Sequence, residues 1–470
     1  MRVLLVNPPV PLMYYNREFY VPSSLLYLGA VLQKNGDEVS ILDMKALKPL
    51  EPKNPIIFYE KTLIKTVNEF KPDLIGIGCL FSGNFLDVLH FSNLLKKNYN
   101  KIPIVIGGIH PTIYAKKILE ECLAIDWIVL GEGEESFIRM VNAIKDKSYD
   151  FSEIDGFAYR KKGKVFLNPK TRFIEDLDSI PLPSYDLINI EDYYEDTSNW
   201  WNPKHLPINT SLPIISSRSC PNHCNFCSMF MVMGPHWRPR SPKNVVDEIE
   251  YLYNKYNHRH FSFMDDNFTL NRKRTIEICK EIINRELDIQ FETPNGISIN
   301  TLNQEVIDAL VSAGMVRVYL AIESGSEYIR NKVMGKNLST EKIYEIVDLV
   351  KKYKQLYVKA FFIIGMPEET HETLEETYDM IKKIVVDRIY LHNVIPFPGT
   401  RVYEQALRDN LLIDLDPKKL YKSNELYITN YERIFIKPYK LELEDLRAFR
   451  KRCNELIEKQ QKMRINKINV

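Results

Sequence analysis

The sequence predicts an α/β protein in which an N-terminal doubly wound, Rossmann-like domain precedes a partial (β/α)6 barrel and a small C-terminal helical region. Short apolar runs alternate with amphipathic stretches over residues 1–145, and the same alternation resumes after residue 211. Six strand-like runs follow between residues 213 and 397. Continuous apolar strands between helices are typical of parallel sheets, whose ligands bind at the carboxyl ends of the strands.

The first domain is expected over residues 1–145 and the barrel over 211–400. Residues 146–210 change character: 156–169 predict a hairpin around Lys162-Gly163, and a proline-punctuated linker follows. Residues 401–470 form a charged C-terminal region, a candidate cap over a substrate site.

The individual elements follow from apolar patterning and end signals. A serine-capped helix that ends at Gly36 is predicted over 23–36, and another capped helix over 241–256. A C-terminal helix is predicted near 442–463. Strands of the first domain are expected at 2–7, 38–43, 74–80, 102–108 and 126–133. Strands of the barrel are expected at 213–219, 260–266, 289–298, 316–324, 358–366 and 388–397.

Charge and hydropathy narrow the class of protein. The 470 residues include 63 basic and 62 acidic ones, so the net charge of +1 gives no electrostatic reason to expect nucleic acid or an anionic membrane as a partner. The longest apolar runs, 74–81 and 360–366, are far shorter than the ~18 residues of a membrane span. The N-terminus does not resemble a signal peptide. We therefore expect a cytoplasmic protein with no transmembrane segment.

Three of the seven cysteines lie in "SRSCPNHCNFCSM", at Cys220, Cys224 and Cys227. The clustering and the odd total favour reduced thiols over disulfides. Three thiolates leave one coordination position open. Zinc would need a fourth ligand, and His223 is adjacent to Cys224, from where it rarely converges on the same ion. The spacing therefore favours a [4Fe-4S] cluster with one open iron over a zinc site or inert thiols.

The strand ends of the first domain supply further candidate ligand contacts. Glycines there let a backbone approach a ligand closely, although simple tight turns are the alternative. His110 is the one histidine at such an end, and residues 1–89 contain none. The candidate residues at these ends are Asn7, Pro8, Leu80, Ser82, Gly107, Gly108, His110, Gly131, Glu132 and Gly133.

These motifs together resemble the radical S-adenosylmethionine (SAM) superfamily, in the subgroup with an N-terminal cobalamin-binding domain. The cysteine spacing carries an aromatic Phe226 before its last cysteine. Further similar stretches are "FMDDNFT", "PNGISINTL", "AIESGS", "FIIGMPEET" and "PFPGT" in the barrel, and "GGIHPT" and "GEGEESF" in the first domain. In this family SAM chelates the fourth iron, which explains the absence of a fourth thiol.

The resemblance implies roles for the barrel residues. The three cysteines hold the cluster. Phe226 lies against the adenine of SAM, and Ile364, Gly365 and Phe397 flank it. Asp265 and Asp266 meet the methionyl amine, Ser298 and Glu323 the ribose or methionine, and Arg240 the methionyl carboxylate. Two departures, Ser298 where many relatives carry arginine and Glu368 where many carry glycine, concern the substrate side.

For the first domain the resemblance implies bound cobalamin. The sequence lacks the D-x-H-x-x-G motif that supplies an axial histidine to cobalt in other cobalamin domains. This fits the radical subgroup, where a protein histidine on cobalt is commonly absent. His110 is therefore expected to contact the corrin or the nucleotide tail, with a plain turn histidine as the alternative.

The implied activity is a cobalamin-dependent radical SAM methyltransferase, in which a 5′-deoxyadenosyl radical activates a carbon and methylcobalamin supplies the methyl group. Cyclisation, ring contraction and ring oxidation form the alternative, and a non-enzymatic, metal-stabilised binding module is a third hypothesis. A methylthiotransferase needs three more N-terminal cysteines, whereas residues 1–200 hold only Cys79 and Cys122. The expected partners are a small-molecule, lipid or peptide substrate and an electron donor such as flavodoxin or ferredoxin.

Overall fold

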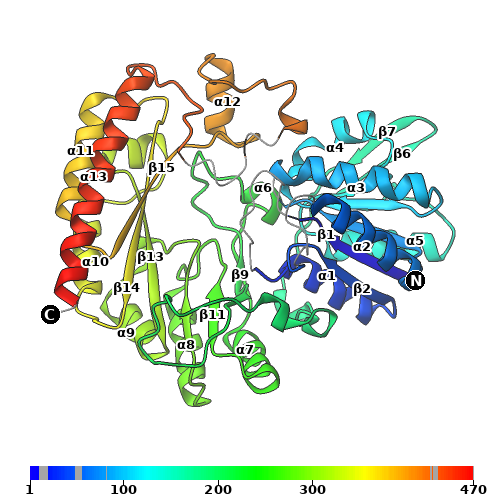
Figure 1. Cartoon of the computed structure of the whole chain (residues 1–470), viewed down its shortest axis with the longest axis horizontal. Helices are drawn as coiled ribbons and strands as arrows, with labels where there is room; N and C mark the ends of the chain where they lie inside the picture. Colours follow the sequence, from blue (N-terminus) through cyan, green and yellow to red (C-terminus); the bar gives the residue numbers. More distant parts are fainter. Residues whose placement is uncertain (10–19, 48–54, 81, 424–425, 427–431, 469–470) are drawn as a thin grey trace. The chain divides into compact units, whose positions relative to one another are not determined.

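The structure is a computed structural model that describes residues 1–9, 20–47, 55–80, 82–423, 426 and 432–468 (Figure 1). The chain forms two compact units. The N-terminal unit comprises Met1–Glu195, Met231–Gly234 and Asp416–Thr429, and the barrel unit comprises Asp196–Phe230, Pro235–Leu415 and Asn430–Val470. Each unit has its own sheet, and the predicted α/β class is confirmed.

The N-terminal unit is built on a seven-stranded sheet in the order β2-β1-β3-β4-β5-β6-β7. Its strands are β1 (Arg2–Asn7), β2 (Glu38–Asp43), β3 (Leu74–Gly78), β4 (Ile104–Gly107), β5 (Trp127–Val129), β6 (Phe157–Lys161) and β7 (Lys164–Asn168). The first five pair in parallel, whereas β6 and β7 form the expected antiparallel hairpin and extend the same sheet.

Helices cover both faces of this sheet. They are α1 (Ser23–Lys34), α2 (Pro55–Phe70), α3 (Phe85–Asn98), α4 (Ile109–Glu121) and α5 (Glu134–Lys145). Leu4 of β1 belongs to a core with Phe91 of α3, while its neighbour Leu5 belongs to a second core with Phe137 of α5. This alternation confirms the doubly wound arrangement. The strand order reverses between β1 and β3, and the carboxyl ends at such a switch point bind ligands.

The barrel unit contains a six-stranded parallel sheet in the order β15-β14-β13-β12-β11-β8. Its strands are β8 (Leu212–Ile214), β11 (His260–Phe263), β12 (Gln290–Glu292), β13 (Met315–Glu323), β14 (Tyr357–Ile364) and β15 (Arg388–Asn393). A short antiparallel pair, β9 (Ser217–Arg218) and β10 (Arg238–Pro239), brackets the cysteine loop. The predicted incomplete barrel is thereby confirmed.

The barrel unit contains eight helices in the described ranges. They are α6 (Phe230–Met233), which is shared with the N-terminal unit, α7 (Pro242–Tyr256), α8 (Arg272–Asn284), α9 (Gln304–Ser312), α10 (Thr340–Val350), α11 (His371–Lys383), α12 (Arg401–Arg408) and α13 (Leu443–Ile468). Figure 1 shows α11 and α13 side by side along β14 and β15, and both pairs of elements, α11–α13 and α13–β15, are in contact. Alternate residues of β14 are therefore buried against helices, and the others face the inside of the barrel.

Some predicted ends were wrong. Ser23 does not cap α1, because the carbonyl of Pro22 accepts the first helical amide hydrogens and no side chain caps the helix. Ser241 does cap α7, by accepting from the backbone N–H of Asn244. The strands expected at 213–219 and 289–298 are much shorter, since the chain turns into loops at their carboxyl ends.

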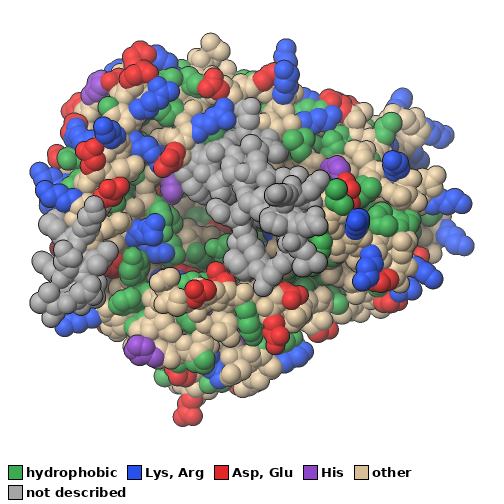
Figure 2. Space-filling model, in the orientation of Figure 1, with side chains coloured by type: hydrophobic (Ala, Val, Ile, Leu, Met, Phe, Trp, Pro, Cys, Tyr) green, Lys and Arg blue, Asp and Glu red, His purple; other side chains and the backbone are tan. Residues whose placement is uncertain are grey.

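The charge on the surface and the length of the helices can be compared with the prediction of no nucleic-acid partner and no transmembrane segment. Figure 2 shows lysine and arginine side chains interspersed with aspartate and glutamate over the visible face. No helix in the described ranges has both the length and the apolar character to cross a membrane.

Candidate functional site

The cysteine loop connects β9 to α6 and is fixed by its backbone. Cys220, Cys224 and Cys227 are free and partly exposed. Ser219 and His223 adopt φ angles of +69° and +46°, which side-chain-bearing residues rarely do, so the loop reverses sharply around the first two thiols. The N–H of Cys227 donates to the carbonyl of Cys224 at 3.1 Å.

The surroundings of the thiols combine burial with two polar side chains, those of Lys336 and Asn267. Burial raises the pKa of all three thiols, that of Cys227 to about 12, while the ammonium of Lys336 lowers the pKa of Cys220 and Cys224. The Nδ2 of Asn267 donates to the Sγ of Cys220 at 3.6 Å. Half-buried thiols of this kind lose their protons when a metal binds them.

The donor set of the loop bears on the choice between a zinc ion and an iron–sulfur cluster. It consists of three thiols, Cys220, Cys224 and Cys227. A cubane cluster binds each thiolate to a different iron, so its ligands lie farther apart than those of one zinc ion. The donor set and the loop therefore fit an iron–sulfur cluster.

Glu323 and Lys336 form a buried ion pair in the barrel unit. Glu323 ends β13 at a register shift, with φ of +71°, and is 7% exposed. The Nζ of Lys336 donates to its Oε1 at 2.5 Å, and Lys336 is itself 8% exposed. The carboxylate and the ammonium together complement the two charges of an amino acid zwitterion. Lys336 was not predicted, because a single lysine in a loop carries no signal in the sequence.

The two predicted aspartates have different surroundings. Asp265 is 2% exposed and accepts hydrogen bonds from the Oγ of Ser216 at 2.8 Å and from the hydroxyl of Ser217, so it fixes the segment that leads into the cysteine loop. Asp266 is less buried and has one backbone hydrogen bond, from Ser219. Burial and the charge of Asp265 raise the pKa of Asp266 to about 6. Asp266 is therefore the carboxylate of this pair that can accept a ligand.

Arg240 forms hydrogen bonds that join α7 to the segment after β8. Its guanidinium donates to the Oε2 of Glu248 at 2.5 Å, to the Oδ1 of Asn244 at 2.6 Å and to the carbonyl of Ile215 at 3.0 Å, and the residue is 4% exposed. These bonds tie α7 to the end of β8. The contact to a methionyl carboxylate that the resemblance implies stays a prediction.

Of the residues predicted around an adenine, Ile364 is fully buried at the end of β14, and Gly365, which follows it, has φ of +88°. Phe397, after β15, and Phe226, in the cysteine loop, are partly exposed. Ser298, predicted to face the ribose or methionine, is also partly exposed.

Glu369, which was not predicted, holds one of these strand ends in place. Its Oε2 accepts the backbone N–H of both Gly365 and Met366. Glu369 is fully buried, and burial raises its pKa to about 8. It therefore clamps the loop that follows β14.

In the N-terminal unit, two of the residues predicted to contact a ligand form hydrogen bonds with other residues of the protein. The Nδ2 of Asn7 donates to Asp43 at 2.9 Å, and a carboxylate oxygen of Glu132 accepts from the N–H of Ile174 at 3.0 Å. Pro8 is buried, whereas Leu80 is 55% exposed. Leu80 is thus an exposed apolar side chain near the end of β3.

His110 is fully buried at the start of α4. Its Nδ1 lies 2.9 Å from the Oγ of Ser82, and its ring packs 4.6 Å from that of Phe85 and 5.0 Å from that of Tyr114. Burial lowers its pKa to about 3, so the ring is neutral. Its Nε2 has no hydrogen-bond partner among the described residues. A neutral ring with one unpaired nitrogen fits a polar contact to a bound group.

Two of the glycines predicted to lie at the carboxyl ends of these strands, Gly108 and Gly131, have positive φ angles, and Gly108 is also required by close backbone approach. At Gly108, where φ is +120°, a Cβ atom would lie 2.3 Å from the carbonyl oxygen of Cys79. At Gly131, where φ is +63°, a Cβ atom would lie 3.0 Å from the Lys170 side chain. Gly107 ends β4 and Gly133 precedes α5. The edge therefore presents backbone with few side chains, as a large flat cofactor needs.

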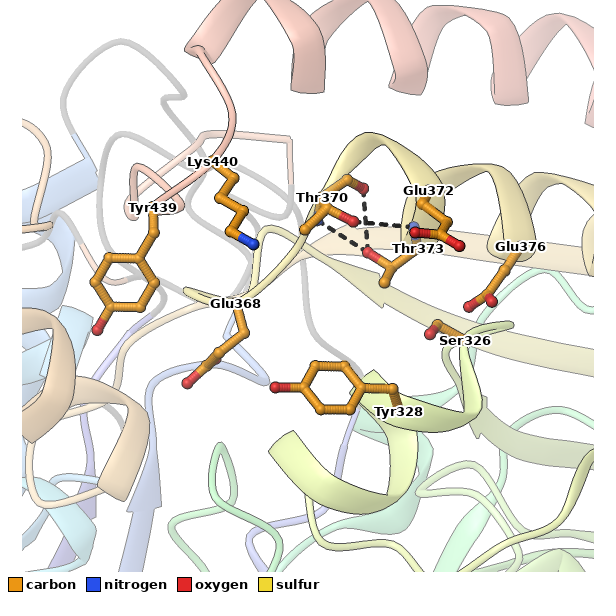
Figure 3. Close-up of a pocket in the computed structure, with 9 residues that line it drawn as sticks. All are labelled: Ser326, Tyr328, Glu368, Thr370, Glu372, Thr373, Glu376, Tyr439 and Lys440. Atoms are coloured by element: carbon orange, nitrogen blue, oxygen red, sulfur yellow. Dashed lines mark hydrogen bonds between the residues drawn. The ribbon is translucent and has the colours of Figure 1, made fainter.

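A separate pocket of about 430 Å³ lies at the start of α11 (Figure 3). It includes Glu368, whose Oε1 accepts from Gln405 at 2.6 Å, and none of the predicted site residues lines it. Its lining residues are Ser326, Tyr328, Glu368, Thr370, Glu372, Thr373, Glu376, Tyr439 and Lys440.

Comparison with known families identifies the class of protein. Residues 17–141 match the B12 binding domain and residues 214–381 match the Radical SAM superfamily. The chain is 32% identical over 421 residues to an uncharacterized methyltransferase of Pyrococcus horikoshii, covering 89% of this chain and 86% of that protein. The chain therefore belongs to the radical SAM enzymes with an N-terminal B12-binding domain, as the sequence predicted.

Other relatives have more specific names. The cytidylyl-2-hydroxyethylphosphonate methyltransferase of Streptomyces wedmorensis is 28% identical, over 90% of this chain and 84% of its own. The anaerobic magnesium-protoporphyrin IX monomethyl ester cyclase of Rubrivivax gelatinosus is 29% identical, over 74% of this chain and 60% of its own. The methyltransferase TsrM of Kitasatospora setae, solved with cobalamin and a [4Fe-4S] cluster, shares the fold with a TM-score of 0.69 at 18% identity, over 88% of this chain and 79% of its own.

Proposed function

We propose that this chain is a cobalamin-dependent radical SAM methyltransferase that methylates an unactivated carbon. The observation that carries the proposal is the constellation in the barrel unit: three partly exposed cysteines on one loop, with Lys336, the partner of Glu323, close enough to lower the pKa of two of them. The methyltransferase relatives support the reaction class.

The cysteines would hold the cluster. The carboxyl ends of the N-terminal strands, where Asn7, Gly108 and Gly131 lie, would hold cobalamin; we call this the glycine edge. When bound, the reduced cluster supplies the electron that cleaves SAM, and cobalamin supplies the methyl group. The cysteine loop, fixed by Asp265 through Ser216 and Ser217, positions the thiolates without help from a ligand. His110, whose Nε2 has no hydrogen-bond partner among the described residues, would contact the cobalamin tail.

Glu323 and Lys336 would bind the methionyl group of SAM by exchanging partners. Glu323 would accept the ammonium of SAM in place of that of Lys336, and Lys336, released from Glu323, would pair with the methionyl carboxylate. Asp266 offers a second carboxylate to the same ammonium. Charge balance is kept throughout, so the desolvated carboxylate is never left without a cation.

The substrate is proposed to be a small molecule, a lipid or a peptide, and the electron donor a flavodoxin- or ferredoxin-like protein. A donor is required because the cluster must be reduced before it acts. A cytoplasmic location fits seven cysteines that are all free.

A cyclase is the second candidate. Its support is the similarity to the magnesium-protoporphyrin IX monomethyl ester cyclase, although this chain spans only 60% of that relative. Cyclisation would leave no methyl group from SAM in the product, which separates the two functions.

The test uses the full chain reconstituted anaerobically with iron, sulfide and cobalamin. We expect about four irons per chain, 5′-deoxyadenosine formation with dithionite, and transfer of a deuterated methyl group from labelled SAM to a substrate seen by mass spectrometry. Deoxyadenosine with no label in any product would favour the cyclase. Absence of both cluster and deoxyadenosine would reject a radical SAM enzyme.

A further inference from the structure

The inside of the partial barrel carries an aromatic wall. Alternate residues of β14 and β15 that point away from the helices, from Tyr357 to His392, are partly exposed, whereas the residues between them are buried. The ring of Phe361 lies 5.6 Å from those of both Tyr319 and Tyr390, and Tyr390 stacks 6.0 Å from His392. Neighbouring aromatic rings therefore line this face of the strands.

Lys359 lies within this wall. Its Nζ donates to the hydroxyl of Tyr319 at 2.7 Å and lies 4.3 Å from the centre of that ring, and 5.8 Å from the rings of Tyr357 and Tyr390. Burial lowers the pKa of Lys359 to about 8, so the ammonium is held where water solvates it poorly. The side chain is surrounded by rings and a phenol.

The nearby carboxylate does not neutralise Lys359. Glu292 forms an ion pair with Arg317 at 3.2 Å and accepts from the Tyr319 hydroxyl at 3.1 Å. Among the described residues, no carboxylate lies within ion-pair distance of the Lys359 Nζ. Around Lys359, the charges that act on it are therefore one carboxylate, Glu292, and two further cations, Arg317 and Arg388.

We propose that Lys359 binds an anionic group of the substrate, a carboxylate or a phosphoryl group, while the aromatic wall formed by Tyr319, Phe361 and Tyr390 holds its apolar body. A half-buried ammonium without a counterion is unfavourable, and a charge-assisted contact to a ligand anion offsets its desolvation. The inference rests on the proposed function, because it takes the barrel interior as the substrate site.

The position of Lys359 along β14 also sets the length of the substrate. Lys359 and Ile363 lie on the same face, four residues apart, which corresponds to about 13 Å at ~3.3 Å per residue. The loop that begins at Gly365 carries the expected SAM contacts. Gly365 lies six residues beyond Lys359, about 20 Å at the same rise per residue, so a substrate that reaches from Lys359 to the expected SAM contacts must be extended.

The test measures binding to the full chain, without SAM, of 4-phenylbutyrate and phenyl phosphate against the neutral 4-phenylbutyramide. Ligand-observed NMR should give at least tenfold tighter binding of the anions to the wild type. Lys359→Met should abolish this preference and Lys359→Arg should retain it. The control, Lys354→Met, removes an exposed lysine nearby and should retain it too. Equal binding of anion and amide to the wild type, or an unchanged preference in Lys359→Met, overturns the proposal.

Two further readouts separate this proposal from a structural role and from the proposed function. The melting temperature of Lys359→Met should equal or exceed that of the wild type, because a desolvated charge is removed; a large decrease would indicate that Lys359 is structural and would overturn the proposal. Deoxyadenosine formation without added substrate should be the same in Lys354→Met and the wild type, because Lys354 is exposed. If the wild type makes none, the proposed function fails, while the anion preference still decides the role of Lys359.

Discussion

Glu323 combines two unfavourable features that a purely structural residue would not need. Its φ of +71° places a side-chain-bearing residue in the left-handed region, at a cost of about 1 kcal/mol. Its carboxylate is also buried, at 7% exposure, against a single ammonium. Strain of this kind persists where the geometry serves a ligand, which is why Glu323 and Lys336 are the strongest candidates for binding SAM.

We expect Glu323→Gln and Lys336→Met each to weaken SAM binding at least tenfold, about 1.4 kcal/mol, because each removes one charge of the pair that the zwitterion would meet. The double variant should lose less than the sum of the two, since the residues act together. Equilibrium binding to the reconstituted protein measures this. Glu305→Gln, an exposed residue on α9, is the control. Wild-type affinity in both single variants would show that the pair is structural.

Asn267 should tune the cluster. Its N–H donates to the Sγ of Cys220 at 3.6 Å, and a hydrogen bond to a ligating sulfur favours the reduced, more negative cluster. Asn267→Leu should therefore lower the reduction potential, by about 40 mV if the bond is worth ~1 kcal/mol. A redox titration followed by electron paramagnetic resonance is the measurement. Asn295→Leu, at an exposed position, should leave the potential unchanged. A potential that does not move in Asn267→Leu contradicts this role.

At the scale of elements, the loop after β14 depends on one buried carboxyl group. Burial raises the pKa of Glu369 from 4.5 to about 8, so the folded protein binds this proton more tightly than the unfolded chain. The contribution of Glu369 to stability is then fully present below pH ~4.5 and is lost as the pH rises toward about 8.

The Glu369→Gln variant should therefore show a smaller fall in unfolding free energy between pH 5 and pH 8 than the wild type does. The glutamine oxygen can still accept the N–H of Gly365 and Met366, so the loop should keep its shape. Urea denaturation across this pH range measures the difference. Glu372→Gln, exposed at the start of α11, should follow the wild-type curve. Parallel curves for Glu369→Gln and the wild type would mean that Glu369 is charged in the folded state.

The elements also show how far the sequence alone could lead. The three cysteines lie within eight residues, so their spacing was enough to predict the cluster loop. Most strands were predictable because buried parallel strands are continuously apolar. The pairing of Glu323 with Lys336 depends on how a loop returns after η6 (Tyr328–Val333), which no local pattern encodes. The difference between Asp265 and Asp266 likewise depends on Ser216 and Ser217, nearly fifty residues earlier.

On the scale of the whole molecule, the chain has two units, each with its own sheet and core. The cysteines, Glu323 and Lys336 belong to the barrel unit, and the glycine edge belongs to the N-terminal unit. Because each unit has its own core, a substitution that disturbs one unit should leave the other folded. Loss of the cofactor in one unit should therefore not cause loss of the cofactor in the other.

Two variants test this independence in opposite directions. Cys224→Ala should abolish deoxyadenosine formation and leave cobalamin bound, because it removes only a cluster ligand. Gly108→Ala should lose cobalamin and keep about four irons, because its Cβ would lie 2.3 Å from the carbonyl of Cys79 and force β3 and β4 apart at the glycine edge. Gly163→Ala is the matched control: its φ is also positive, at +75°, but no atom lies within 4 Å of the added Cβ.

Iron content, cobalamin absorbance and urea denaturation should be measured on all three proteins. Gly163→Ala should cost only about 1 kcal/mol, the ordinary penalty of a positive φ, and should retain both cofactors. Gly108→Ala should cost several times more, because the close contact is with backbone that cannot rotate away. Loss of cobalamin in Cys224→Ala, or of iron in Gly108→Ala, would mean that the two sites fold as one, and the assignment of one cofactor to each unit would then be wrong.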